Sequence, residues 1–81
     1  MLVTTGSITA AQRLAAAIER GCGAPASVVH TPAEINSGGC SYSVRFNDRY
    51  EAEVRRIAEE YDMQVRRFFR GSAAGGYYAV P

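Results

Sequence analysis

The chain has 81 residues, of which nine are basic and eight are acidic, and its formal charge is +1. This length allows one small domain, and it favours a functional site on loops at one end of a sheet over a large enclosed pocket. The near balance of charge argues against a protein that binds nucleic acid or an anionic membrane without specificity. All nine basic residues are arginine, so chemistry that needs a lysine amine is excluded.

Two cysteines, Cys22 and Cys40, are too few for the disulfide framework of a small secreted protein. The first residues, Met1–Thr5, lack the basic segment and the apolar stretch of a signal peptide. No apolar run approaches the ~20 residues that a membrane span needs. We therefore expect a cytoplasmic protein that does not associate with membranes and whose cysteines begin as free thiols.

The first third of the chain predicts a strand followed by a helix. Residues 2–5 are rich in β-branched side chains, and Gly6 and Ser7 then turn the chain into a helix over about residues 7–20. The helix carries an apolar stripe at helical spacing: Ile8, Ala11, Leu14, Ala15 and Ile18. Glycines on both sides of Cys22 end this helix.

The remainder predicts strands over residues 27–31, 40–46 and 63–70, with a second helix between the last two. Asn47 and Asp48 open this helix, whose predicted buried stripe is Tyr50, Val54, Ile57, Ala58 and Tyr61. The last strand does not alternate cleanly, so we expect a bulge near Arg66 and Arg67.

The order β-α-β-β-α-β predicts an α+β, ferredoxin-like plait with a four-stranded antiparallel sheet and two helices on one face. We expect a single domain over residues 1–70 and a flexible tail, rich in Gly, Ala and Tyr, over residues 71–81. In this topology the Gly6–Ser7 turn, the loop before Cys40 and the Tyr61–Asp62 turn meet at one end. Cys22 lies at the other.

Cys40 is the candidate reactive residue, because it follows Gly38 and Gly39 at the rim of the predicted sheet. The backbone N–H groups of these glycines, and those of the Gly6–Ser7 turn at the start of the first helix, favour a negative charge and would lower the pKa of a thiol. His30, the only histidine, is a candidate neighbour of Cys40 across the hairpin.

Other interpretations of these residues stay open. Cysteines are often buried as small apolar side chains, and His30 also fits a plain position at a strand end. No paired metal-ligand spacing occurs in the sequence, so we expect neither a metal site nor a cofactor. An RNA-binding plait needs aromatic side chains on the open face of its sheet. On that face the predicted strand over residues 40–46 has Ser41, Ser43 and Arg45 instead.

From Val3 to Arg70 the chain resembles a family of small bacterial domains described as putative selenium/sulfur carrier protein-like. That family has a Pro-x-Glu-Ile-Ser loop running into Cys-Gly and an alternating strand that ends in Arg-Phe. The matching segment here begins at Pro32, passes Glu34 and Ile35, and continues through Cys40 to Phe46. In this chain Ser41 follows the cysteine, and the glycines precede it.

The resemblance implies a carrier that holds sulfur or selenium on Cys40 as a persulfide or perselenide. Its partners would be a donor protein, such as a cysteine desulfurase, and an acceptor protein. On this interpretation the protein carries or binds an atom and is not a turnover enzyme. The alternative is a non-catalytic regulatory or interaction module in which Cys40 is structural. The sequence leaves open whether the protein forms a homodimer. A third interpretation is metal or redox sensing through Cys40 and His30.

Overall fold

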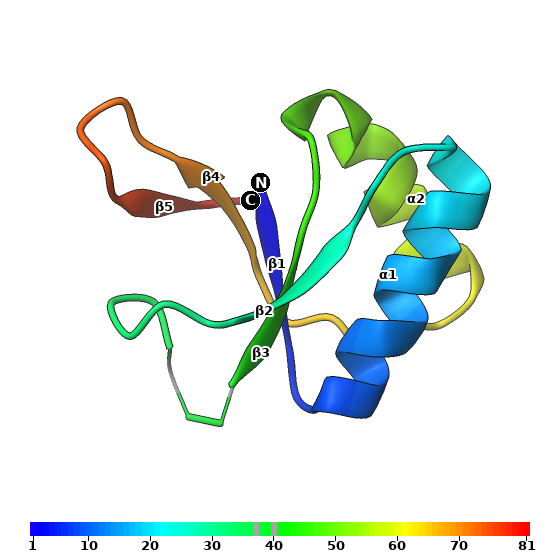
Figure 1. Cartoon of the computed structure of the whole chain (residues 1–81), viewed down its shortest axis with the longest axis horizontal. Coiled ribbons are helices and arrows are strands. Elements are labelled where there is room, and N and C mark those ends of the chain that lie inside the picture. The colour runs from blue at the N-terminus through cyan, green and yellow to red at the C-terminus, as the bar shows by residue number, and fades with distance from the viewer. Residues whose placement is uncertain (37, 40) are drawn as a thin grey trace.

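The sheet has five strands, one more than predicted (Figure 1). The computed structural model describes residues 1–36, 38–39 and 41–81, so Cys40 lies outside the described residues. The strands are β1 (Leu2–Thr5), β2 (Ser27–His30), β3 (Tyr42–Arg45), β4 (Phe68–Gly71) and β5 (Tyr77–Val80). Their order across the sheet is β2-β3-β1-β4-β5, and all neighbours are antiparallel.

Two helices pack on one side of this sheet, which confirms the predicted α+β class (Figure 1). The first is α1 (Ile8–Cys22), and the second is α2 (Glu51–Glu60), which a short 3-10 helix, η1 (Asp48–Tyr50), precedes. The core between helices and sheet contains mainly aliphatic side chains and two phenylalanines: Met1, Val3, Ala11, Leu14, Ala15, Ile18, Val44, Phe46, Val54 and Phe68.

The prediction of four strands is wrong because part of the segment assigned to the tail joins the sheet. Strand β5 pairs with β4 from Phe68↔Val80 to Gly71↔Tyr77. A turn reverses the chain between the two strands, with Gly75 at φ +101°, a value that glycine adopts readily. Residues 71–76 are rich in Gly and Ala, which favours a flexible tail, so the strand-forming residues 77–80 that follow were not predicted as a strand. Strand β4 is therefore internal and not an edge strand.

Helix α1 begins at the cap that the sequence predicts, but it ends two residues later than predicted, because Gly21 is helical and the helix stops only at Gly23. The Ser7 hydroxyl accepts a hydrogen bond from the Ala10 N–H at 3.1 Å, and Gly23 takes a left-handed conformation with φ +64°. The predicted apolar stripe is correct from Ala11 onward, but Ile8 is 44% exposed. The buried face of the helix therefore begins one turn later than the sequence indicates.

Helix α2 also follows a predicted cap, although a 3-10 turn intervenes. The Asn47 side chain accepts a hydrogen bond from the Arg49 N–H at 3.0 Å. Three predicted stripe residues are buried, namely Val54, Ile57 and Ala58. Tyr61 was predicted in that stripe but is 62% exposed, because it follows the last helical residue with non-helical dihedral angles.

The face of the sheet opposite the helices is also largely buried at its centre. Leu2, Thr4, Ser43 and Phe69 alternate onto this face, and each is less than one tenth exposed. The Ser43 hydroxyl lies 2.6 Å from the hydroxyl of Thr31, at the start of the loop between β2 and β3. Figure 1 shows this loop and the β4–β5 hairpin projecting on the side away from the helices.

A β-bulge lies just before β4, where the sequence predicts one. The Arg66 N–H donates to the Thr4 carbonyl, and the Thr4 N–H donates to the Arg67 carbonyl, both at 2.8 Å. Two consecutive residues thus oppose one residue of β1, which is the arrangement of a bulge. The regular strand starts at Phe68 instead of at the predicted Met63.

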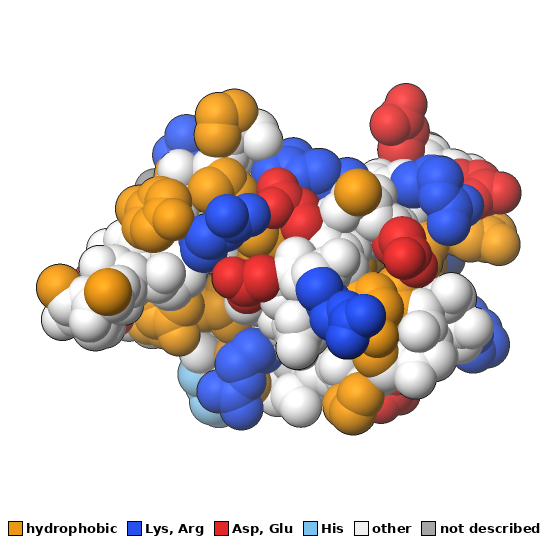
Figure 2. Space-filling view, turned by 90° about the horizontal axis from the view of Figure 1, so that it is seen from above, with side chains coloured by type: hydrophobic (Ala, Val, Ile, Leu, Met, Phe, Trp, Pro, Cys, Tyr) orange, Lys and Arg blue, Asp and Glu red, His pale blue; other side chains and the backbone are white. Residues whose placement is uncertain are grey.

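The surface carries charges of both signs. On the face shown in Figure 2, acidic and basic side chains are interspersed, with apolar side chains between them. Among the described residues, no helix is long and apolar enough to cross a membrane.

Candidate functional site

Strands β1 and β3 bring the start of α1 beside the loop that precedes β3. Thr5 pairs with Tyr42, and its hydroxyl lies 2.9 Å from the Tyr42 carbonyl and 3.1 Å from the Ser7 carbonyl. A hydroxyl has one proton, so Thr5 donates to one of these carbonyls at a time. The contacts tie the Gly6–Ser7 turn to the beginning of β3.

A third segment, the turn after α2, reaches the same end of the fold. Downstream of this turn, Arg66 lies against the Gly6–Ser7 turn: a Cβ on Gly6 would be 3.1 Å from its guanidinium nitrogen Nη2. A hollow of about 280 Å³ separates the turn from the first turns of α1, with Ser7, Asp62 and Gln64 among its lining residues. We call this region, made of Gly6, Ser7, Gly38, Gly39 and the 61–64 turn, the loop end.

Gly38 and Gly39 are conformationally required in their loop. Both are exposed, and their φ angles of +59° and +91° lie in the region that favours glycine. A Cβ at either position would meet no atom within 4 Å, so backbone conformation, and not lack of space, selects glycine here. Cys40, the central residue of the predicted site, lies outside the described residues, and its role stays a prediction.

The start of α1 carries the partial positive charge of a helix N-terminus, and Asp62 lines the hollow beside it. The first turn contains no acidic residue, and the Ser7 side chain accepts one N–H of that turn. The partial positive charge of a helix N-terminus favours an anion nearby. The guanidinium of Arg66, which the sequence analysis did not assign to the site, adds a full positive charge beside Gly6.

His30 lies at the end of β2, opposite Tyr42 of β3. The two rings contact each other, with centroids 5.1 Å apart and planes inclined by 35°. Within the described residues, aromatic contact therefore accounts for the position of His30. No group of three or more His, Cys, Asp or Glu side chains in the described part of the chain could hold a metal ion.

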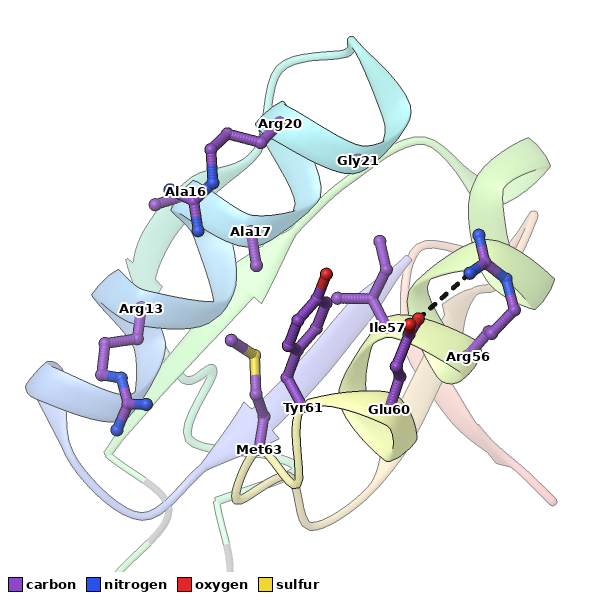
Figure 3. Close-up of a pocket in the computed structure, with 10 residues that line it drawn as sticks. All are labelled: Arg13, Ala16, Ala17, Arg20, Gly21, Arg56, Ile57, Glu60, Tyr61 and Met63. Atoms are coloured by element: carbon purple, nitrogen blue, oxygen red, sulfur yellow. Dashed lines mark hydrogen bonds and ion pairs between the residues drawn. The ribbon is translucent and has the colours of Figure 1, made fainter.

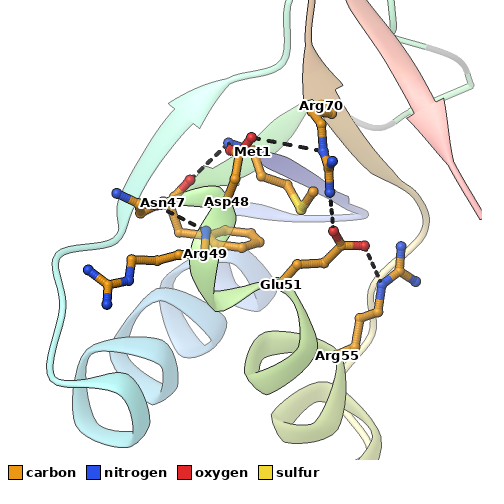
Figure 4. A network of polar contacts seen from close by, with 8 residues as sticks. Met1, Asn47, Asp48, Arg49, Glu51, Arg55 and Arg70 are labelled. Atoms are coloured by element: carbon orange, nitrogen blue, oxygen red, sulfur yellow. Dashed lines mark hydrogen bonds and ion pairs between the residues drawn. The ribbon is translucent and has the colours of Figure 1, made fainter.

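The opposite end of the molecule contains a network of ion pairs (Figure 4). The Met1 ammonium lies 2.7 Å from the Asp48 carboxylate, and its hydrogen bond lowers the pKa of Asp48. Arg70 donates to Glu51, which also pairs with Arg55 at 3.1 Å. We call these five residues, together with their contacts, the network end.

Cys22 lies at this same end, at the last position of α1, and packs against the core. Partial burial raises the pKa of its thiol, and the nearby Glu53 carboxylate raises it further; the positive charge of Arg56 opposes this effect. The neutral thiol is therefore favoured at Cys22, which packs against the core at the end of α1.

A second hollow was not anticipated from the sequence. It lies between α1 and α2 on their outer surface, has a volume of about 550 Å³, and is lined by Arg13, Ala16, Ala17, Arg20, Gly21, Arg56, Ile57, Glu60, Tyr61 and Met63 (Figure 3). The sequence does contain two arginines seven residues apart on one helix face. Only the packing of α2 shows that they border a groove.

Comparison with protein families gives a match over most of the chain. The model of a family described as "Putative Se/S carrier protein-like" matches residues 1–70. This range includes the loop end and both helices, and it stops before β5. No curated protein and no solved structure matches the chain.

Proposed function

Because the chain belongs to this family of Se/S carrier-like proteins, we propose that it carries sulfur or selenium on Cys40 as a persulfide or perselenide. The family match over residues 1–70 is the observation that carries the proposal. It covers Cys40 together with the glycines before it and the start of α1. A carrier needs a reactive thiol and a docking surface, and an 81-residue chain has room for both.

The transfer step is a thiolate exchange. The Cys40 thiolate attacks the terminal sulfur of a persulfide on the donor protein, such as a cysteine desulfurase. A bond forms between Cys40 Sγ and that sulfur, the donor's S–S bond breaks, and the donor cysteine leaves as a thiolate. The electrons balance without an external oxidant, and the proton stays on the transferred sulfur. An acceptor then removes the atom by the same exchange.

The electrostatics of the loop end support an anionic sulfur at this position. The N-terminus of α1 and the Arg66 guanidinium supply positive charge around Gly6 and Ser7. In the proposed state the N–H groups of Gly38 and Gly39 donate to the thiolate or persulfide anion. Stabilising the anion lowers the pKa of the thiol, so a larger fraction is reactive at neutral pH.

Intact-protein mass spectrometry tests the proposal. The wild-type chain, Cys40→Ser and Cys22→Ser are each incubated with a cysteine desulfurase and cysteine. We expect an added mass of about 32 Da, one sulfur atom, on the wild type and on Cys22→Ser. Treatment with dithiothreitol should remove this added mass, because a persulfide is reducible.

Cys40→Ser is the decisive variant, and Cys22→Ser is its matched control. If Cys40→Ser gains the same mass as the wild type, or if no chain gains it, Cys40 is not the carrier. A chain that gains no sulfur from the desulfurase, or from a small-molecule polysulfide, would favour the alternative of an interaction module with a structural Cys40.

A further inference from the structure

The groove between α1 and α2 combines arginines with small and apolar side chains (Figure 3). Arg13 and Arg20 lie along its α1 side, and both are exposed. Across the groove, Arg56 is paired with Glu60 at 3.3 Å, so these two charges compensate each other. In the described residues neither Arg13 nor Arg20 forms an ion pair, and the groove therefore has an excess of positive charge.

The floor of the groove is formed by small and apolar side chains. Ala16, Ala17 and Gly21 leave space on α1, and Ile57 and Met63 line the other side. At Gly21 the helices approach so closely that a Cβ there would lie 2.7 Å from Ile57 Cδ1. A glycine inside a helix destabilises it by about 1 kcal/mol relative to alanine, and close packing of the helices accounts for its presence.

Tyr61 adds exposed apolar area beside this floor. Its ring points into the space between the helices in Figure 3, yet it is 62% exposed. Aromatic side chains and arginines are the residues that most often dominate binding energy at protein interfaces. A ligand that fills this groove would therefore contact an apolar strip with positive charge along one side.

The spacing of the arginines favours an extended ligand over a small anion. Arg13 and Arg20 are two helical turns apart, a rise of about 10 Å along the axis. Figure 3 shows their guanidinium groups separated along the groove and not converging on one point. An acidic amphipathic helix presents carboxylates seven residues apart on one face, at the same spacing, beside an apolar stripe.

We propose that this groove docks an acidic amphipathic helix of the protein partner in the transfer reaction, an inference that rests on the proposed function. The second hollow shares Arg13 and Met63 with the groove and extends to Ser7 at the loop end. A helix in the groove thus runs toward the end of the fold that contains the loop before Cys40. Docking at Arg13 and Arg20 orients the partner, and the sulfur transfer takes place at the loop end.

A designed peptide tests the docking surface directly. The probe is a fluorescent 15-residue amphipathic helix with Glu at two positions seven residues apart and Leu and Ala facing the groove. Binding to the full chain is followed by anisotropy, and the site by chemical shifts of the Ala16, Ala17 and Ile57 amides. In Arg13→Glu/Arg20→Glu we expect at least about tenfold weaker binding, because two attractive contacts become repulsive.

Arg49→Glu/Arg67→Glu is the matched control, since it makes the same change in net charge at two exposed positions outside the groove. We expect it to alter the affinity less than about threefold. A second peptide with Lys in place of Glu should bind the Arg13→Glu/Arg20→Glu variant better than the wild type. This charge exchange shows that the variant is folded and that its groove is intact.

The docking proposal is wrong if the acidic peptide does not bind, or if both double variants lose the same amount of peptide affinity. It is also wrong if inorganic phosphate or a nucleotide shifts the same amides at a lower concentration than the peptide does. Cys40→Ser should bind the peptide normally. The persulfide test and the docking test can therefore fail independently of each other.

Discussion

The loop end and the network end differ in the charged groups that surround them. At the network end, carboxylates and cations pair with one another, as in the contacts of Glu51 with Arg55 and Arg70. At the loop end, the first turn of α1 has no acidic residue and Arg66 lies beside Gly6. At the network end the carboxylates are paired with cations. At the loop end Arg66 and the N-terminus of α1 supply positive charge beside Gly6 and Ser7, and Asp62 lies on the neighbouring turn.

The comparison bears directly on the two cysteines. Cys22 lies at the network end, where burial and Glu53 raise the pKa of its thiol. The same kind of side chain placed at the loop end would meet a helix N-terminus and an arginine, which lower a thiol pKa. The position of a cysteine in the fold thus determines the direction in which the pKa of its thiol is shifted.

The sharpest test is the rate at which each cysteine is alkylated at neutral pH. Each unit of pKa difference changes the thiolate fraction about tenfold, so we expect Cys40 to react at least about tenfold faster than Cys22. Because the pKa of Cys22 is raised, its rate should stay low at neutral pH and increase only as pH rises through that value. Iodoacetamide labelling of Cys22→Ser and Cys40→Ser, followed by mass spectrometry, measures both rates.

Glu53→Gln supplies the control for this contrast. Removing the carboxylate should lower the pKa of Cys22 and increase its alkylation rate, while the rate of Cys40 stays unchanged. Equal, slow labelling of both cysteines in the wild type would contradict the proposed difference between the two ends.

The next largest effect is expected at the buried hydroxyl pair near the loop end. Ser43→Ala leaves the Thr31 hydroxyl buried without its partner at 2.6 Å, and we expect a loss of about 1–3 kcal/mol in unfolding free energy. Urea denaturation of the variant and the wild type measures it. Thr31→Val/Ser43→Ala removes both hydroxyls and should lose less than the sum of the single variants. A simple sum would show that the two hydroxyls are not coupled.

The glycine loop should show a smaller and more local effect. Gly39→Ala places a side chain at φ +91°, which we expect to destabilise the native loop by about 1 kcal/mol and to slow the modification of Cys40. Gly71→Ala is the control, because its φ is outside the left-handed region and a Cβ meets no atom within 4 Å. Thermal unfolding and alkylation rates check both variants. A faster reaction of Cys40 in Gly39→Ala would speak against a loop held in an anion-binding conformation.

The smallest effects are expected at the network end, since its charges are partly solvated. Glu51→Gln removes contacts to Arg55 and Arg70, and we expect a loss of up to about 1 kcal/mol that decreases with added salt. Glu60→Gln breaks a more exposed pair with Arg56 and should cost about 0.3 kcal/mol. Denaturant unfolding at low and high ionic strength measures the loss of stability in each of the two variants. Any change in the reactivity of Cys40 would show that the two ends are not independent.

Most of the fold could be predicted from local patterns. Ser7, Gly23 and Asn47 mark their helix ends correctly, because a cap depends on hydrogen bonds within a few residues. Residues 2–5 form β1 as predicted, and the bulge at Arg66 and Arg67 follows from broken alternation. The errors at Ile8, Tyr61 and residues 77–80 concern positions at the ends of elements or of the chain, where periodicity gives little information.

Less of the candidate site could be predicted. The sequence predicts that Gly6, Ser7, Gly38 and Gly39 share one end of the fold, and this grouping stays a prediction. The contacts of Thr5 join Ser7 to Tyr42 at the start of β3. The suggested approach of His30 to Cys40 falls outside the described residues, and within them His30 contacts Tyr42. The sequence predicts a bulge at Arg66 but does not indicate that its side chain lies beside Gly6, because that contact depends on how this segment packs against the end of β1.

The two helices, four of the five strands and the family could be predicted from the sequence, because capping, periodicity and a short motif act over neighbouring residues. Which distant residues share a surface depends on how the elements pack. This packing places Glu53 near Cys22, Arg66 against Gly6, and α2 beside Arg13 and Arg20. A charge alters the pKa of a thiol, and two helices form a groove, only when packing brings segments far apart in the chain within a few ångströms.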